Sequence, residues 1–219
     1  IASIVLVCSA AYLIWYFTDL NNQNKKLEFI QSIYDTNRND YTYNQDGQFS
    51  KFDELKRQNS DIRGWLSIDN TELDNPVYQT IDNDFYITHD MNKEKNSYGA
   101  LFLDFRCDVN PLTISQNQII YGHNMRYGAM FGTLREYRNL NFYKSHPVIN
   151  FDSLYETRKY KIVAIMVCDS GVDQAFGYDF TPYTPDFATQ EEFLLWIERC
   201  RVRSLINTNV DVNAQDEVI

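Results

Sequence analysis

The sequence has few basic residues, and its cysteines do not occur in closely spaced pairs. Lys and Arg together number 20 against 30 Asp and Glu, which gives a formal net charge of −10 at pH 7. A nucleic-acid partner is therefore not expected, because phosphate binding requires a basic surface. The four cysteines show no CxxC or CxxxC spacing, so the sequence indicates no zinc site. We expect neither a metal ion nor another cofactor.

Charge is also absent from the first 17 residues. A membrane-spanning helix needs roughly 20 apolar residues, with a range of about 17 to 25. Trp15, Tyr16 and Phe17 are typical of the membrane–water interface. We therefore expect residues 1–20 to form a single-pass signal anchor in the cell membrane, with the catalytic domain extracellular. The first residue is Ile rather than Met, so we expect the true N-terminus to lie upstream.

Two other structures would also explain this apolar segment. The polar residues that follow Phe17 argue against a buried core helix. A cleaved signal peptide is harder to exclude, because Ala10 and Ala11 supply the small residues of a cleavage site. The apolar run continues beyond these alanines, which favours an uncleaved anchor.

Residues 21–58 are mostly polar, and we interpret them as a stalk and an N-terminal helical segment. One helical face is expected to carry Glu28, Phe29, Ile30, Ile33 and Tyr34. A second short helix is expected to begin near Phe52, with Ser50 as its N-cap. A disordered linker is the alternative.

Residues 59–219 alternate short strand patterns with turns. The 16 Tyr and 14 Phe of the chain are typical of a β-rich core. Strands are expected at 65–68, 77–79, 99–104, 118–121, 148–151 and 160–167. Strands at this density indicate a barrel or a sandwich. A helix should interrupt them from Thr189 to about Arg203, because Thr189 and Glu192 form a capping box before apolar residues at helical spacing.

The stretch from Asn117 to Leu134 contains the main candidate for catalysis. The apolar run 119–121 predicts a buried strand, which ends at Gly122, a residue that permits positive φ. His123 follows directly at the strand end, where functional residues are common. From the residue alone, a hydrogen-bonded turn histidine is an equally good interpretation.

Several motifs resemble those of the sortases, most closely the class B sortases. The histidine motif is Tyr121-Gly-His-Asn-Met125, followed by Met130-Phe131 and Leu134. The other motifs follow the family's order and rough spacing: Gly64–Ile68, Asn75–Gln79, Asp82–Tyr86 and Gly99–Asp104. The resemblance covers about residue 50 to the end. It implies a mainly β structure with helices, in which residues 59–219 form a sortase-type β-barrel.

Class B sortases are cysteine transpeptidases of Gram-positive cell surfaces, so the resemblance implies acyl transfer. Such an enzyme cleaves the sorting signal of a secreted surface protein after a Thr and joins it to a peptidoglycan precursor amine. The resemblance implies His123 as the catalytic acid. It also implies that the substrate peptide is bound by Tyr121, Asn83, Ile87 and Tyr178, although ordinary packing would equally explain most of these side chains.

The family's nucleophile follows the inserted helix in a Thr-Leu-x-Thr-Cys motif, and an arginine lies on the next strand. Residues 1–219 contain no such motif. The resemblance therefore places the nucleophilic Cys and the Arg beyond Ile219, and we expect this chain alone to be inactive.

Cys168 precedes the inserted helix and ends an apolar run. A buried cysteine usually behaves as a small apolar side chain, whereas an exposed one beside a histidine would be activated as a nucleophile. Two alternatives to a sortase therefore stay open. One is a membrane-anchored binding module without turnover, and the other is a Cys168–His123 hydrolase.

Overall fold

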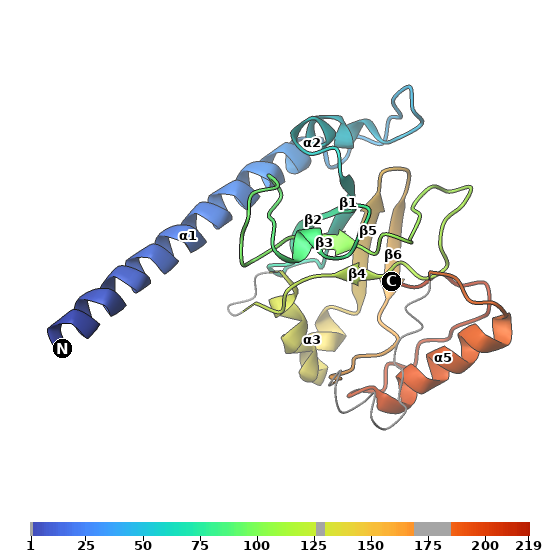
Figure 1. Cartoon of the computed structure of the whole chain (residues 1–219). Helices are drawn as coiled ribbons and strands as arrows, with labels where there is room; N and C mark the ends of the chain where they lie inside the picture. Colours follow the sequence, from blue (N-terminus) through green and yellow to red (C-terminus); the bar gives the residue numbers. More distant parts are fainter. Residues whose placement is uncertain (1, 126–129, 169–184) are drawn as a thin grey trace.

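A computed structural model describes residues 2–125, 130–168 and 185–219 of the chain (Figure 1). The helices in these residues are α1 (Ala2–Asn37), η1 (Ser50–Phe52), α2 (Asp53–Gln58), η2 (Phe85–Ile87), η4 (Phe131–Arg138), α3 (Leu140–Ser145) and α5 (Gln190–Arg203). The strands are β1 (Ile62–Ser67), β2 (Asp74–Tyr78), β3 (Leu101–Leu103), β4 (Ile120–Tyr121), β5 (Val148–Ser153) and β6 (Thr157–Lys161). Three of the helices, labelled η, have 3₁₀ geometry.

The six strands form one sheet with the order β4-β3-β2-β1-β5-β6. Only β2 and β3 are parallel, and the other described neighbours are antiparallel. Successive residues of a strand alternate between two apolar clusters, as Trp65 and Leu66 of β1 do. The cluster that contains Trp65 is completed by α1 and α2, and the one that contains Leu66 by η4 and α3. Both faces of the sheet are therefore covered.

Each of the six strands predicted over the ranges above forms at least in part. β3 and β4 are shorter than predicted, with Leu101–Leu103 in place of 99–104 and Ile120–Tyr121 in place of 118–121, and the last strand also ends early. β6 stops at Lys161, so the expectation of a strand over 160–167 is wrong beyond that residue. Beyond Lys161 the backbone carbonyls bond to the segment that follows α5. Leu205 N donates to Ile165 O at 2.8 Å, and Thr208 Oγ1 donates to Val163 O at 2.7 Å. An apolar run therefore forms a packed irregular segment here.

The predicted helix over 189–203 is confirmed as α5. Thr189 Oγ1 accepts from Glu192 N at 3.1 Å, which is half of the expected capping box. Phe193, Ile197 and Cys200 are buried along one face.

The stalk is the continuation of α1, which runs without a break to Asn37 (Figure 1). The alternative of a disordered linker is wrong for residues 21–37, because Ile30 and Tyr34 are buried against the domain. The proposed helical face is also wrong in part, since the Phe29 side chain is 56% exposed. The first half of the helix projects away from the sheet.

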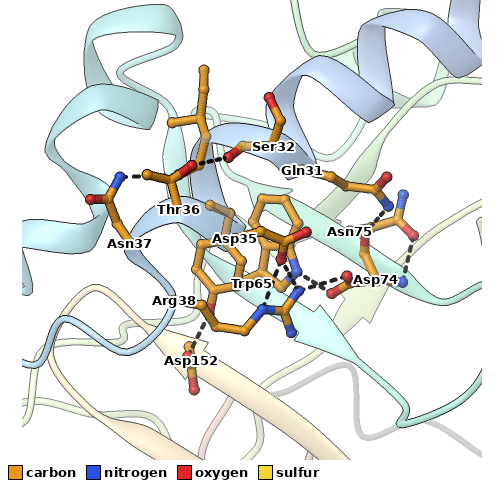
Figure 2. A network of polar contacts seen from close by, with 12 residues as sticks. Gln31, Ser32, Asp35, Thr36, Asn37, Arg38, Trp65, Asp74, Asn75 and Asp152 are labelled. Carbon is orange, nitrogen blue, oxygen red and sulfur yellow. Dashed lines mark hydrogen bonds and ion pairs between the residues drawn. The ribbon is translucent and has the colours of Figure 1, made fainter.

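A network of polar and aromatic contacts fastens the last turns of α1 to β1 and β2 (Figure 2). The Tyr34 ring stacks on Trp65 with a centroid distance of 4.0 Å. The indole Nε1 of Trp65 donates to Asp74 Oδ1 at 2.6 Å. Arg38 forms an ion pair with the other oxygen of Asp74 at 2.7 Å. The direction of the projecting helix is therefore set by the domain itself.

Ser50 does not cap a helix, contrary to the sequence prediction. It is the first residue of η1, and neither η1 nor α2 has a side-chain N-cap. Its backbone N–H donates to Thr42 O at 2.8 Å instead. This arrangement turns Lys51 inward, where its ammonium group pairs with Asp152 of β5 at 2.6 Å.

Candidate active site

His123 lies two residues beyond the end of β4, and its carbonyl oxygen accepts a hydrogen bond from Phe131 N at 3.0 Å. The ring nitrogen Nε2 lies 2.8 Å from the carbonyl oxygen of Ile87. A carbonyl oxygen only accepts, so this contact requires the proton on Nε2. Nδ1 is then the nitrogen left for proton exchange. The half-buried imidazole is thus held in one tautomer and orientation.

Gly122 is required here for space rather than for backbone freedom. The expectation of positive φ is wrong, because the described glycines with positive φ are Gly47 and Gly99. A Cβ at position 122 would lie 2.2 Å from Leu101 Cδ2 and 3.0 Å from Phe131 Cδ2. Any side chain would therefore push β4 away from β3 and move the adjoining histidine.

The carbonyl that holds His123 belongs to η2, which packs against the start of β3. Gly99 makes this packing possible, since its Cβ would lie 2.5 Å from Tyr86 O and 2.8 Å from Ile87 O. Its φ of +61° is also unfavourable for other residues. Ala100 N then donates to Tyr86 O at 3.0 Å. The turn that carries Ile87 is therefore fixed to the sheet.

Asp104, the residue after β3, joins three segments around this histidine. Its carboxylate is fully buried and forms a two-pronged ion pair with Arg106, whose Nε and Nη2 donate at 2.8 and 2.7 Å. Asn83 Nδ2 donates to Oδ2 at 2.9 Å, and the Tyr121 hydroxyl donates to the same oxygen at 3.0 Å. The side chains of Tyr121 and Asn83 therefore donate to the same buried carboxylate oxygen.

These hydrogen bonds decide the charge state of Asp104. Burial alone would raise the pKa of a carboxyl group. The hydrogen bonds from Arg106, Asn83 and Tyr121 outweigh burial and lower the pKa of Asp104 to about 2. The group is therefore an anion throughout the physiological range and serves as a fixed acceptor rather than a proton carrier.

Replacing Asp104 by asparagine should flatten the loss of stability in acid. A folded-state pKa of about 2 lies below the ordinary value of about 3.9. Such a group contributes stability that is fully present above the unfolded pKa and is lost as pH falls through the folded pKa. The variant should therefore be less stable at neutral pH and less sensitive to pH in this window. Thermal unfolding at a series of pH values tests this, and parallel curves for the two proteins would contradict it.

The structure brings together four of the five site residues predicted from the sequence. His123 contacts the Ile87 carbonyl, and Tyr121 and Asn83 share Asp104. Tyr178 lies outside the described residues. Asp104 and Arg106 were not predicted as site residues, although the sequence shows an acidic residue directly after an apolar run and a basic residue two positions later.

Cys168 is exposed and lies near Cys200 of α5. Burial, and in second place the neighbouring Cys168, raise the pKa of the Cys200 thiol to about 11. Burial raises the pKa of Cys107 to about 11 as well, and its thiol donates to Asn117 O at 3.3 Å. Neither buried thiol has the low pKa of a nucleophile. Within the described ranges, no cluster of His, Cys, Asp and Glu could hold a metal ion.

Curated relatives of the chain are sortases B. Sortase B of Listeria monocytogenes is 34% identical over 166 residues, which are 76% of this chain and 63% of the relative. Sortase B of Staphylococcus aureus is 28% identical over 169 residues, which are 77% of this chain and 65% of the relative. The chain thus spans slightly less than two thirds of either relative. No family model matches the chain.

Solved structures of sortase B share the fold. Sortase B from Listeria monocytogenes is 32% identical with a TM-score of 0.65, covering 75% of this chain and 89% of that one. A Staphylococcus aureus sortase B–substrate complex is 23% identical with a TM-score of 0.80, covering 91% and 87%. The sheet is therefore the curled β half-barrel of sortase B, and the predicted fold class is confirmed.

Proposed function

This chain belongs to the class B sortases, and on that basis we propose that the protein is a cysteine transpeptidase that attaches surface proteins to the cell wall. The observation that carries the proposal is the fixed imidazole of His123. Its Nε2 is held by Ile87 O at 2.8 Å, at the end of a strand whose Tyr121 is anchored on Asp104. A general acid needs such a defined position and tautomer.

In the proposed reaction the cysteine thiol first gives its proton to His123 Nδ1, which leaves a thiolate beside an imidazolium. The thiolate attacks the carbonyl carbon of a Thr in the sorting signal. The C–N bond breaks, and His123 Nδ1 gives its proton to the leaving amine. The resulting thioester is attacked by an amine of the peptidoglycan precursor, whose proton passes back to His123 as the thiolate leaves. Tyr121, Asn83 and Ile87 would line the peptide's path, with Tyr178 as a further contact.

Residues 1–219 supply His123 from the family's His–Cys–Arg set. We propose that the nucleophile and the oxyanion-stabilising arginine lie beyond Ile219, so that these 219 residues alone do not turn over. The Staphylococcus aureus neighbour was solved with its substrate, which supports a peptide partner for this protein.

The test uses a form of the protein that carries the nucleophilic cysteine. A sorting-signal peptide and an amine acceptor should give a threonyl–amine product in mass spectrometry, and alkylation of the thiol should abolish it. Peptide binding without any product would favour the binding module. Cleavage by residues 1–219 that disappears on Cys168→Ala would favour the Cys168 hydrolase.

We propose that α1 anchors the protein in the membrane, with the domain outside the cell. The helix is long and apolar enough to cross a membrane, and its apolar window is not buried in the structure. Such a helix is also found in signal sequences, so the anchor is tested directly. After high-speed centrifugation of disrupted cells the protein should sediment with membranes, whereas a version that begins at Asn21 should stay in the supernatant. An intact protein in the supernatant would contradict the anchor.

A further inference from the structure

Asp104 is a buried anion that the reaction proposed above does not use. Its Oδ2 accepts hydrogen bonds from Arg106, Asn83 and Tyr121, and its Oδ1 accepts from Arg106 Nε and from the Arg106 backbone N–H at 2.8 and 2.9 Å. Its side chain is 0% exposed. A carboxylate with every oxygen occupied cannot bind a ligand, so its role concerns the groups that it holds.

The first of these groups is at the end of the strand that leads to the histidine. Tyr121 lies two residues before His123, and its hydroxyl is fixed to Asp104 at 3.0 Å. Asp104 N also donates to Ile119 O at 2.8 Å. Residue 104 is therefore bonded to the backbone just before β4 and to the side chain that ends it.

The second group, Asn83, belongs to the turn whose Ile87 carbonyl contacts the histidine. Asn83 donates to Asp104 and accepts from Phe105 N at 3.0 Å. It belongs to the same tight turn as Ile87, whose N–H reaches back to Asp84 O at 3.3 Å. Asp104 thereby anchors both partners of the hydrogen bond between His123 Nε2 and Ile87 O.

We propose that Asp104 is a positioning residue that keeps His123 in the Nε2–H tautomer by fixing the Asn83–Ile87 turn and Tyr121 relative to each other. This inference rests on the proposed function for its purpose, because the acyl transfer needs a histidine whose Nδ1 is free to take up a proton and return it. The hydrogen bond itself is a property of the folded chain and is measurable without turnover.

An asparagine at position 104 would break this arrangement with little change in shape. Its amide has one oxygen to accept and an NH₂ group that only donates. That NH₂ group would face donors from Arg106, Asn83 or Tyr121. We therefore expect the Asn83–Ile87 turn to shift and the contact between Ile87 O and His123 Nε2 to weaken.

The chain offers a matched control at Asp152. This carboxylate also accepts from a cation and a tyrosine hydroxyl, those of Lys51 and Tyr34. Its side chain is only 13% exposed, and these partners come from α1 and η1 rather than from the residues around His123. Asp152→Asn should lower stability through the loss of a buried ion pair without affecting the histidine.

The measurement is imidazole ¹⁵N–¹H NMR of the whole protein in detergent micelles, at an alkaline pH where the rings are neutral. The chain has three histidines, and two of them are internal references. His89 Nδ1 faces Phe85 O at 2.8 Å, and His146 Nδ1 faces Phe142 O at 3.0 Å. These two rings should show the Nδ1–H pattern, whereas His123 alone should show the Nε2–H pattern.

In Asp104→Asn the His123 signals should move toward an average of the two tautomers, while His89 and His146 stay unchanged. Asn83→Ala should produce the same change, and it decides the question alone if the first variant does not fold. Asp152→Asn should leave all three rings as in the wild type. An unchanged His123 in Asp104→Asn or in Asn83→Ala would overturn the proposal. A failure of transpeptidation would leave this result standing, so the two proposals are separable.

Discussion

Replacing His123 by alanine should lower the rate of transpeptidation by about 10²–10⁴-fold, the usual loss on removal of a positioned general acid. The structure adds a reason to expect the upper part of this range. The ring is held by Ile87 O at 2.8 Å, and a small side chain leaves no group to replace it. The measurement is the rate of product formation from a sorting-signal peptide and an amine, with the form that carries the nucleophilic cysteine.

His146→Ala is the matched control. His146 is the C-cap of α3, where its ring packs on Phe142 and its Nδ1 faces the Phe142 carbonyl at 3.0 Å. It resembles His123 in having a carbonyl partner, but it adjoins none of the proposed substrate residues. This variant should keep the wild-type rate. Wild-type turnover by His123→Ala would remove the residue from the mechanism.

The position of His123 was predictable from the sequence, but its partner was not. A short apolar run before Gly-His marks a strand end, and β4 ends there. The Ile87 carbonyl comes from 36 residues upstream. Every residue has a carbonyl, so no side-chain pattern identifies the one that a histidine will contact.

The same distinction applies to Asp104. An aspartate that follows a strand is usually a solvated turn residue, and only the fold shows that Arg106, Asn83 and Tyr121 converge on it. Strands such as β1 and β3 were predictable because burial on both faces leaves a short apolar run between turn residues. The end of β6 was not predictable from the sequence. The apolar residues that follow Lys161 bond to a segment that comes after α5 in the chain.

Replacing Lys51 by methionine should lower the free energy of unfolding by about 3 kcal/mol, the lower end of the range for breaking a buried ion pair. The Lys51 side chain is 0% exposed and its ammonium lies 2.6 Å from Asp152. Its ammonium also lies 4.8 Å from the ring centres of Tyr41 and Phe49. Methionine preserves the length and apolar stem of lysine, so the main loss is the charge. Among the described side chains, Asp152 would then keep the Tyr34 hydroxyl as its hydrogen-bond donor, and its side chain is 13% exposed to water.

This loss of stability should be seen for a buried ion pair and not for an exposed one. Arg57→Met removes an ion pair between two residues of α2, Arg57 and Glu54, whose side chains are 68% and 38% exposed. Exposed pairs contribute at most about 1 kcal/mol, so this control should be close to wild type. Urea unfolding in detergent micelles, which hold the apolar helix in solution, measures both variants.

The double variant Lys51→Met, Asp152→Asn separates the pair from its surroundings. If the loss in Lys51→Met comes from an uncompensated carboxylate, neutralising Asp152 as well should recover part of it. The cost of the double variant should then be less than the sum of the two single variants. Additive costs, or a Lys51→Met variant as stable as Arg57→Met, would show that this lysine contributes packing rather than charge. Because the same carboxylate binds Tyr34 of α1, a confirmed coupling would also explain how the domain fixes the direction of its N-terminal helix.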